Sequence, residues 1–133
     1  MSSSSRRATS WFAAANAING AKDLSESDTA IIHNLKSINV DPVPKTGIDR
    51  TSGNETMRPQ YIKDSSVAWL ASALAHDAYH VAQYLRGEPY RGQASEVPAN
   101  DFQARVGAKF GLTQDDLNHL KKDTHQANDG TSY

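Results

Sequence analysis

The sequence contains no cysteine among its 133 residues. Its absence excludes a disulfide framework, a thiolate nucleophile and any zinc or iron–sulfur site with cysteine ligands. A metal ion bound by this chain must therefore be held by histidine, carboxylate or amide groups.

Long hydrophobic runs and an excess of one charge are missing as well. No apolar run approaches the roughly 20 residues that cross a bilayer, so we expect no membrane span. The first ten residues lack the apolar core of a signal peptide, although export as part of a larger bacterial protein stays open. With 14 Lys and Arg against 15 Asp and Glu, the net charge is -1, and this balance argues against nucleic-acid binding because no overall positive field attracts phosphates.

The chain length fits one domain with one core. We expect residues 1–133 to form a single domain in which the Ser-rich segment 1–8 and the polar segment 128–133 are flexible. The hydrophobic periodicity favours a mainly α fold, with an α+β arrangement left open.

Apolar residues at helical spacing, with capping residues at the ends, predict five helices. Pro98 is expected in the first turn of the fourth helix, where proline is tolerated. The Pro- and Gly-containing segment 39–64 is expected to be irregular, with one small hairpin around residues 52–54. The helices are predicted at about 10–20, 26–38 and 65–86, at 95–111 with its start at Ser95 or Ala94, and at 113–125.

Two histidines stand four residues apart on the longest predicted helix, His76 and His80. At this spacing their side chains share one helix face, with Cβ atoms about 5–6 Å apart, so both can bind one metal ion. Catalytic zinc sites typically add one further protein ligand and leave the fourth position to water. A third ligand is therefore required.

Glu96 is the candidate third ligand, because Gly87, Pro89 and Gly92 lie between it and His80 and let the chain double back. Polar residues elsewhere could assist the site. Those on the side of Glu96 are Asn100 and Gln103, a further histidine is His119, and the tyrosines, which nothing in the sequence ranks, are Tyr79, Tyr84 and Tyr90.

Residues 74–83 and 96–103 together resemble the two-helix core of the zincin metallopeptidases, whose signature is His-Glu-x-x-His with a downstream Glu in a Glu-x-x-Ala setting. They are particularly similar to short metallopeptidase-like domains at the C-terminal tips of bacterial polymorphic toxins and secreted effectors. The resemblance implies Zn²⁺ as cofactor, His76, His80 and Glu96 as ligands and Asp77 as general base. It also implies a protein or peptide substrate and a cognate immunity or inhibitor protein.

Asp77 departs from the zincin pattern, which has Glu at this position. The aspartate carboxylate is shorter by about one C–C bond, about 1.5 Å, and a misplacement of about 1 Å can cost 10²-fold in rate. The sequence leaves four consequences open: a different approach of the helix to the metal, a second bridging water, weak or absent peptidase activity, or hydrolysis of another kind of bond.

A second enzyme class competes for the same segment. The His76-Asp77 doublet also resembles that of the HD-type metal phosphohydrolases, which are helical and add an upstream His and a downstream Asp. In that interpretation His33 is the upstream ligand and the distant Asp is Asp101 or Asp123. The histidine at position 80 is then incidental.

A non-catalytic interpretation stands beside both enzyme classes. The chain could be a helical binding module in which His76, His80 and Glu96 hold a structural zinc ion or no metal. Metal content without activity would favour it.

Overall fold

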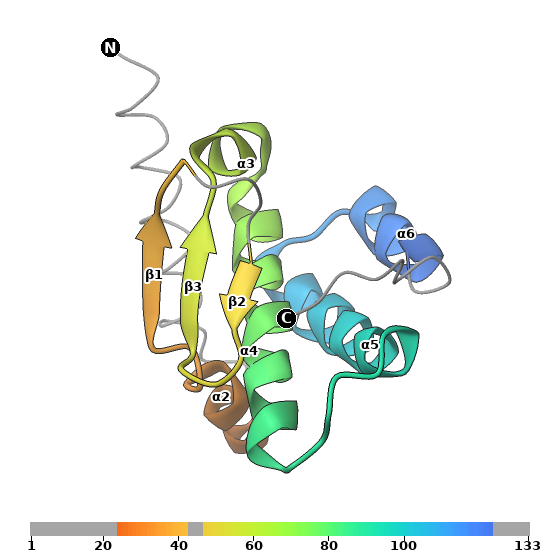
Figure 1. The fold of residues 1–133 in the computed structure, drawn as a ribbon. Coiled ribbons are helices and arrows are strands. Elements are labelled where there is room, and N and C mark those ends of the chain that lie inside the picture. The colour runs from red at the N-terminus through yellow and green to blue at the C-terminus, as the bar shows by residue number, and fades with distance from the viewer. Residues whose placement is uncertain (1–23, 43–46, 124–133) are drawn as a thin grey trace.

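The computed structural model describes residues 24–42 and 47–123. Helices account for 62% of them, which confirms the mainly α prediction. The helix predicted at 10–20 and the terminal segments 1–8 and 128–133 lie outside the described residues. In chain order the elements are α2 (Glu26–Ile32), β1 (Ser37–Val40), β2 (Gly47–Asp49), β3 (Asn54–Met57), α3 (Pro59–Asp64), α4 (Val67–Leu85), α5 (Gln93–Phe110) and α6 (Gln114–Asp123) (Figure 1).

Helix α4 is the centre of the fold, close to the predicted bounds of 65–86. It begins after Ser66, whose hydroxyl accepts a hydrogen bond from the Trp69 backbone N–H as an N-cap does. The sheet lies on one side of α4 and α5 on the other (Figure 1). Both partners bury apolar side chains against it, so one core joins the described helices and sheet. This core includes Met57, Ile62, Leu70, Leu74, Phe102 and Val106.

Helix α5 begins at Gln93, earlier than predicted, so Pro98 lies beyond the first turn and the expectation for its position was wrong. Proline has no N–H to give to the carbonyl four residues earlier. That carbonyl belongs to Ala94, which is exposed, so water can replace the missing bond. The helix ends as predicted at Gly111, in the left-handed conformation with φ of 105°.

Helices α4 and α5 approach each other closely at Gly107. A Cβ atom at this position would lie 3.1 Å from the Ser72 Cβ and 2.3 Å from the Leu112 Cδ1. A larger residue would require the Leu112 side chain to move and the Ser72 Cβ to shift by a few tenths of an ångström. Glycine thus favours the close packing of α5 against α4.

The prediction of one helix over 26–38 was wrong beyond Ile32. The Asn34 and Leu35 N–H groups bond back to Ile31 and Ile32 and close the helix, and Lys36 then donates to the Gly53 carbonyl at 2.8 Å. Ile38 does contact the core, but from β1 rather than from a helix. A single apolar residue at helical spacing fits either arrangement, because one contact does not define a period.

The expected hairpin is present: β2 pairs with β3 in antiparallel fashion. Strand β1 lies parallel to β3 on its other side, giving the order β1-β3-β2. Neither β1 nor the short helix α3 was predicted. The first half of β1 fell in the helix predicted over 26–38, and residues 39–64 were expected to be irregular apart from the hairpin. The sheet forms because the chain returns from α2 to the far edge of β3, a long-range pairing without a local signal.

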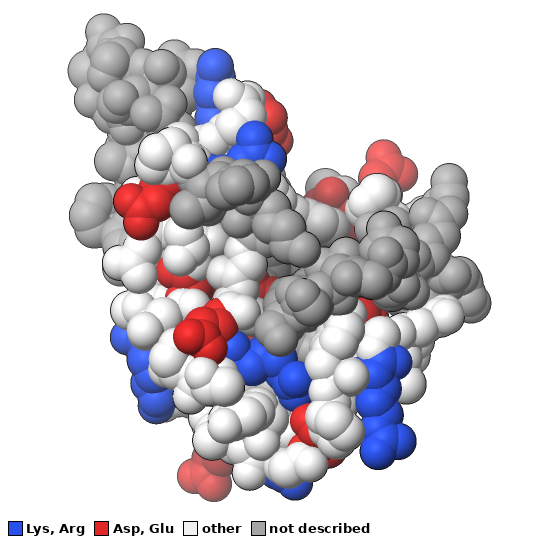
Figure 2. Space-filling model, viewed as in Figure 1, with Lys and Arg blue, Asp and Glu red and all other residues white. Residues whose placement is uncertain are grey.

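None of the helices within residues 24–42 and 47–123 is long and apolar enough to span a bilayer. Acidic and basic side chains are interspersed over the face shown in Figure 2, in keeping with the balanced charge of the whole chain.

Candidate metal centre

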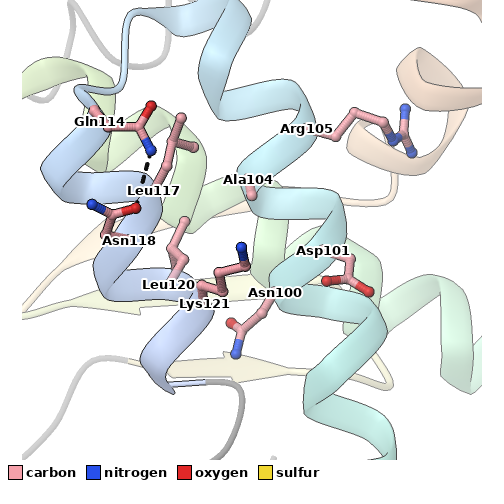
Figure 3. A pocket seen from close by; sticks show the side chains of 9 residues that line it. All are labelled: Asn100, Asp101, Ala104, Arg105, Gln114, Leu117, Asn118, Leu120 and Lys121. Carbon is pink, nitrogen blue, oxygen red and sulfur yellow. Dashed lines mark hydrogen bonds between the residues drawn. The ribbon is translucent and has the colours of Figure 1, made fainter.

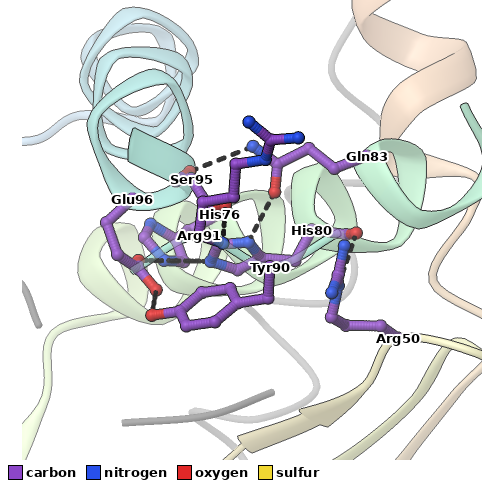
Figure 4. Close-up of polar contacts among 8 residues, drawn as sticks. All are labelled: Arg50, His76, His80, Gln83, Tyr90, Arg91, Ser95 and Glu96. Atoms are coloured by element: carbon purple, nitrogen blue, oxygen red, sulfur yellow. Dashed lines mark hydrogen bonds and ion pairs between the residues drawn. The ribbon is translucent and has the colours of Figure 1, made fainter. Parts of the chain in front are cut away.

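The three predicted ligands converge at the contact between α4 and α5 (Figure 4). Nε2 of His76 and Nε2 of His80 are 3.1 Å apart. Oε1 of Glu96 lies 3.1 Å from the first and 3.2 Å from the second. All three side chains are buried. They are the one group of three or more potential ligand residues that could hold a metal ion within the described part of the chain.

The triangle matches the donor set and the size of a tetrahedral zinc site. Ligand atoms at about 2.0–2.1 Å from a tetrahedral zinc ion lie about 3.3 Å from one another. The three separations of 3.1, 3.1 and 3.2 Å are within a few tenths of that value. Two imidazole nitrogens and one carboxylate oxygen also form a donor set that zinc accepts. The residues present therefore fit the ion.

Gln83 fixes the tautomer of His80. Its Nε2 donates to the Ser95 carbonyl at 3.0 Å, which can only accept, so Oε1 faces the imidazole. Nδ1 of His80 lies 2.8 Å from this oxygen and must be the donor. In the neutral ring Nε2 then has no proton and directs its lone pair toward the Glu96 oxygen, which is also an acceptor. A cation between the two resolves this conflict.

Tyr90 orients Glu96 from the loop between the two helices. Its hydroxyl donates to Oε2 at 2.7 Å, while Oε1 faces the histidines. Arg50, which follows β2, donates to the backbone carbonyls of His80 and Glu88 and lies 5.9 Å from the centre of the Tyr90 ring. The sequence did not distinguish Tyr90 from Tyr79 and Tyr84. In the structure Tyr90 is distinguished by its hydrogen bond to Glu96.

The charges at the site follow from these contacts. Burial alone would raise the pKa of Glu96, but hydrogen bonds from His76 and His80 and their charges lower it far below its usual value. Burial disfavours the charged form of His76, yet the bond to Glu96 and the nearby charges of Asp77 and Glu96 raise its pKa overall. The pocket therefore favours an anionic carboxylate beside a positive charge, and a metal ion supplies such a charge.

Asp77 lies about 100° around α4 from His76, on the side of the helix that faces the sheet. It is buried there, and it interacts with the carboxyl group of Glu55 from β3. Burial, followed by the charge and hydrogen bonding of Asp77, raises the pKa of Glu55 to about 12. Sequence analysis missed Glu55 because its segment was expected to be irregular.

The accessory candidates separate into one residue at the site and three elsewhere. Gln103 contributes to the raised pKa of His76 and donates to the Ser72 hydroxyl at 3.0 Å. Asn100 lines a hollow between α5 and α6 (Figure 3). His119 is exposed and its ring contacts Trp69, with centroids 5.9 Å apart. Tyr79 packs its ring on Phe102, 5.3 Å between centroids.

Of the residues that an HD-type site would add, neither His33 nor Asp101 joins the three ligands in the described part of the chain. His33 is an exposed cap at the end of α2. Asp101 is exposed on α5 and lines the same hollow as Asn100. Asp123 is the last residue of α6, and its side chain lies outside the described part of the structure. Comparison of the chain with family models, curated proteins and solved structures found no match in any of the three.

Proposed function

We propose that this protein is a zinc-dependent hydrolase, and specifically a metallopeptidase. The observation that supports the proposal is the buried triangle of His76 Nε2, His80 Nε2 and Glu96 Oε1, with sides close to those of a tetrahedral zinc site. These are the residues that the zincin resemblance aligns with metal ligands. A helical binding module without a metal ion would not require these three side chains to face one another in a buried position.

Each residue then has a defined task. His76, His80 and Glu96 hold the ion, Gln83 fixes the His80 tautomer, and Tyr90 holds the outer oxygen of Glu96. When bound, zinc supplies Lewis-acid chemistry: it makes water a better nucleophile and polarises a carbonyl.

Asp77 is the proposed general base. It is the titratable residue next to His76 on α4, and its charge acts on that imidazole. Its carboxylate accepts a proton from the attacking water and returns it to the leaving amine. Its interaction with Glu55 places this carboxyl group next to β3.

The substrate class and biological setting rest on the resemblance of residues 74–103. We propose a protein or peptide substrate, a role as a bacterial toxin or secreted effector domain, and a cognate immunity or inhibitor protein. The buried ligands and the balanced surface charge offer no comparable support for a nucleic-acid substrate.

Metal analysis tests the proposal most directly. Protein purified without chelators should contain about one zinc ion per chain, and His80→Ala should abolish this content. His119→Ala is the matched control, because His119 is an exposed histidine outside the triangle.

The zinc-loaded protein should also cleave unfolded casein in a reaction that a chelator stops. Absence of zinc binding by titration would contradict the whole proposal, and zinc without hydrolysis of casein or a peptide library would reduce it to a structural metal site.

A further inference from the structure

A hollow with a volume of about 480 Å³ lies between α5 and α6 (Figure 3). Its volume is within the range of sites that bind small ligands, about 300–1,000 Å³. Apolar side chains from both helices line it, Ala104 from α5 and Leu117 and Leu120 from α6. The hollow can therefore receive an apolar side chain of a ligand.

Asn100 is the buried polar residue of this lining. Its relative exposure is 7%, and its side chain projects from α5 on the side of α6 (Figure 3). Among the described residues no group forms a hydrogen bond with its side-chain amide. A buried amide without a partner costs free energy, which a ligand with matching groups recovers. Asn100 thus points to a ligand in the hollow.

The charges around the hollow favour a neutral ligand. The Arg105 guanidinium is paired with Asp28 of α2. Asp101 and Lys121, which also line the hollow, are exposed and have opposite charges. The amide of Asn100 offers an acceptor oxygen and a donor NH₂ group, and these match the N–H and C=O of a peptide group.

We propose that the hollow binds an apolar residue of the peptide substrate: Asn100 hydrogen-bonds to its peptide group, and its side chain packs between Ala104 and the leucines of α6. The assignment to a substrate rests on the proposed function, whereas the binding of an apolar residue with its peptide groups does not. Asn100 follows Glu96 by four residues on α5, about 6 Å along the helix axis. An extended peptide rises about 3.3 Å per residue, so the bound residue lies within about two residues of the cleaved bond.

Nuclear magnetic resonance tests this site without zinc or hydrolysis. N-acetyl-L-leucinamide has an apolar side chain between two peptide groups. It should cause saturable shifts of the Asn100 side-chain amide signal and of the Leu117 and Leu120 methyl signals in the full chain. N-acetylglycinamide has the same peptide groups without the side chain and should bind at least about ten-fold more weakly. Shifts without saturation, or equal binding of the two compounds, would overturn the proposal.

Two variants test the contacts in the hollow. Asn100→Ala removes the amide and should weaken the binding of N-acetyl-L-leucinamide by about three- to ten-fold, the effect of one lost hydrogen bond. Asn39→Ala is the matched control, because Asn39 is exposed on β1, and it should bind as wild type does. Ala104→Phe fills the hollow and should abolish binding, which decides the question even if Asn100→Ala does not fold. Wild-type affinity in a folded Ala104→Phe variant would contradict the proposal.

Cleavage of a peptide library by the zinc-loaded protein tests the link to the substrate. Apolar residues should be enriched within about two positions of the cleaved bonds, and Ala104→Phe should remove this enrichment without loss of zinc. Cleavage without such enrichment would overturn the assignment to the substrate. A protein without zinc or hydrolysis would contradict the proposed function, and the titration with N-acetyl-L-leucinamide would then still decide whether the hollow binds an apolar peptide residue.

Discussion

His80 donates its Nδ1 proton to Oε1 of Gln83 across 2.8 Å, and this bond decides which nitrogen of His80 faces the other ligands. Gln83 lies one turn further along α4 and is itself held by the Ser95 carbonyl at the start of α5. The tautomer at the site is thus set by contacts that join the two helices. Residues that orient metal ligands in this way commonly matter for metal affinity.

Gln83→Ala should weaken zinc binding by about 10–100-fold, the usual effect of removing a group that orients a ligating histidine. The imidazole would then be free to rotate or to place its proton on Nε2. Competition with a chromophoric zinc chelator measures the affinity. Gln114→Ala is the control, since Gln114 is exposed on α6 and bonds only to Asn118 among the residues described. Equal zinc affinity in the two variants would show that Gln83 does not set the tautomer.

The stability of the protein should fall with rising pH because of Glu55. The unfolded chain has the ordinary Glu pKa of 4.5, whereas burial and Asp77 raise the pKa in the folded protein to about 12. Between these values the folded state binds a proton that the unfolded state has lost. The contribution is therefore fully present below pH 4.5 and decreases by about 1.4 kcal/mol for each pH unit above it.

The Glu55→Gln variant isolates this term, since the amide does not titrate. We expect the difference in unfolding free energy between Glu55→Gln and wild type to grow in favour of the variant from pH 5.5 to 7.5, by about 1.4 kcal/mol per unit. Urea denaturation of the zinc-free proteins measures this difference in unfolding free energy. The pH-dependent contribution of His76 is present in both proteins and cancels. The exposed control Glu88→Gln should run parallel to wild type. Parallel curves for Glu55→Gln would mean that Glu55 is ionised in the folded protein.

The sequence predicted those parts of the fold and site that depend on local patterns. Apolar periodicity over many turns predicted α4, and capping residues placed the ends of α5 and α6 within a few residues. The ligands were predictable because two lie on one face of a single helix and the third begins the next. Short loops then leave few ways for these two helices to pack.

What the sequence could not supply were contacts between distant segments. Strand β1 exists because it pairs with β3, and its residue Ile38 continued the helical spacing of α2. The interaction of Glu55 with Asp77 joins β3 to α4. An isolated glutamate in a segment rich in turn residues does not indicate such a contact in the sequence. Nothing in the sequence distinguished Tyr90 from Tyr79 and Tyr84. Its role follows from the loop conformation, in which its hydroxyl donates to Glu96.

Two histidines separate the candidate enzyme classes. A zincin-like site requires His80, which is fully buried in the triangle, and does not use His33, which is exposed at the end of α2. Zinc content and hydrolysis should therefore be lost in His80→Ala and kept in His33→Ala. Elemental analysis combined with assays on casein and on a phosphodiester substrate provides the measurement. Loss of phosphodiester hydrolysis in His33→Ala with activity intact in His80→Ala would establish the HD-type alternative.

Asp77→Asn is the decisive variant for the mechanism. The amide keeps the size of the side chain but cannot accept a proton, so turnover should fall by about 10²–10⁴-fold, the usual contribution of a general base. Zinc should stay bound, because all three ligands are intact. Asp101→Asn, at an exposed position of α5, is the matched control and should leave turnover unchanged.

Asp77→Glu tests whether the site could recover the longer carboxylate of the zincin signature. In the structure Asp77 is buried against Glu55, so the added methylene meets a second carboxyl group rather than open space. We expect a loss of about 1–3 kcal/mol in stability, typical of overpacking, together with reduced turnover.

The double variant Glu55→Ala with Asp77→Glu should recover part of the lost stability and turnover, because the smaller residue on β3 makes room for the longer one on α4. Stability and kcat measured over this cycle give the coupling between the two positions. Additive effects would show that Glu55 and Asp77 act independently, and higher turnover in Asp77→Glu alone would show that the sheet leaves space for the longer base.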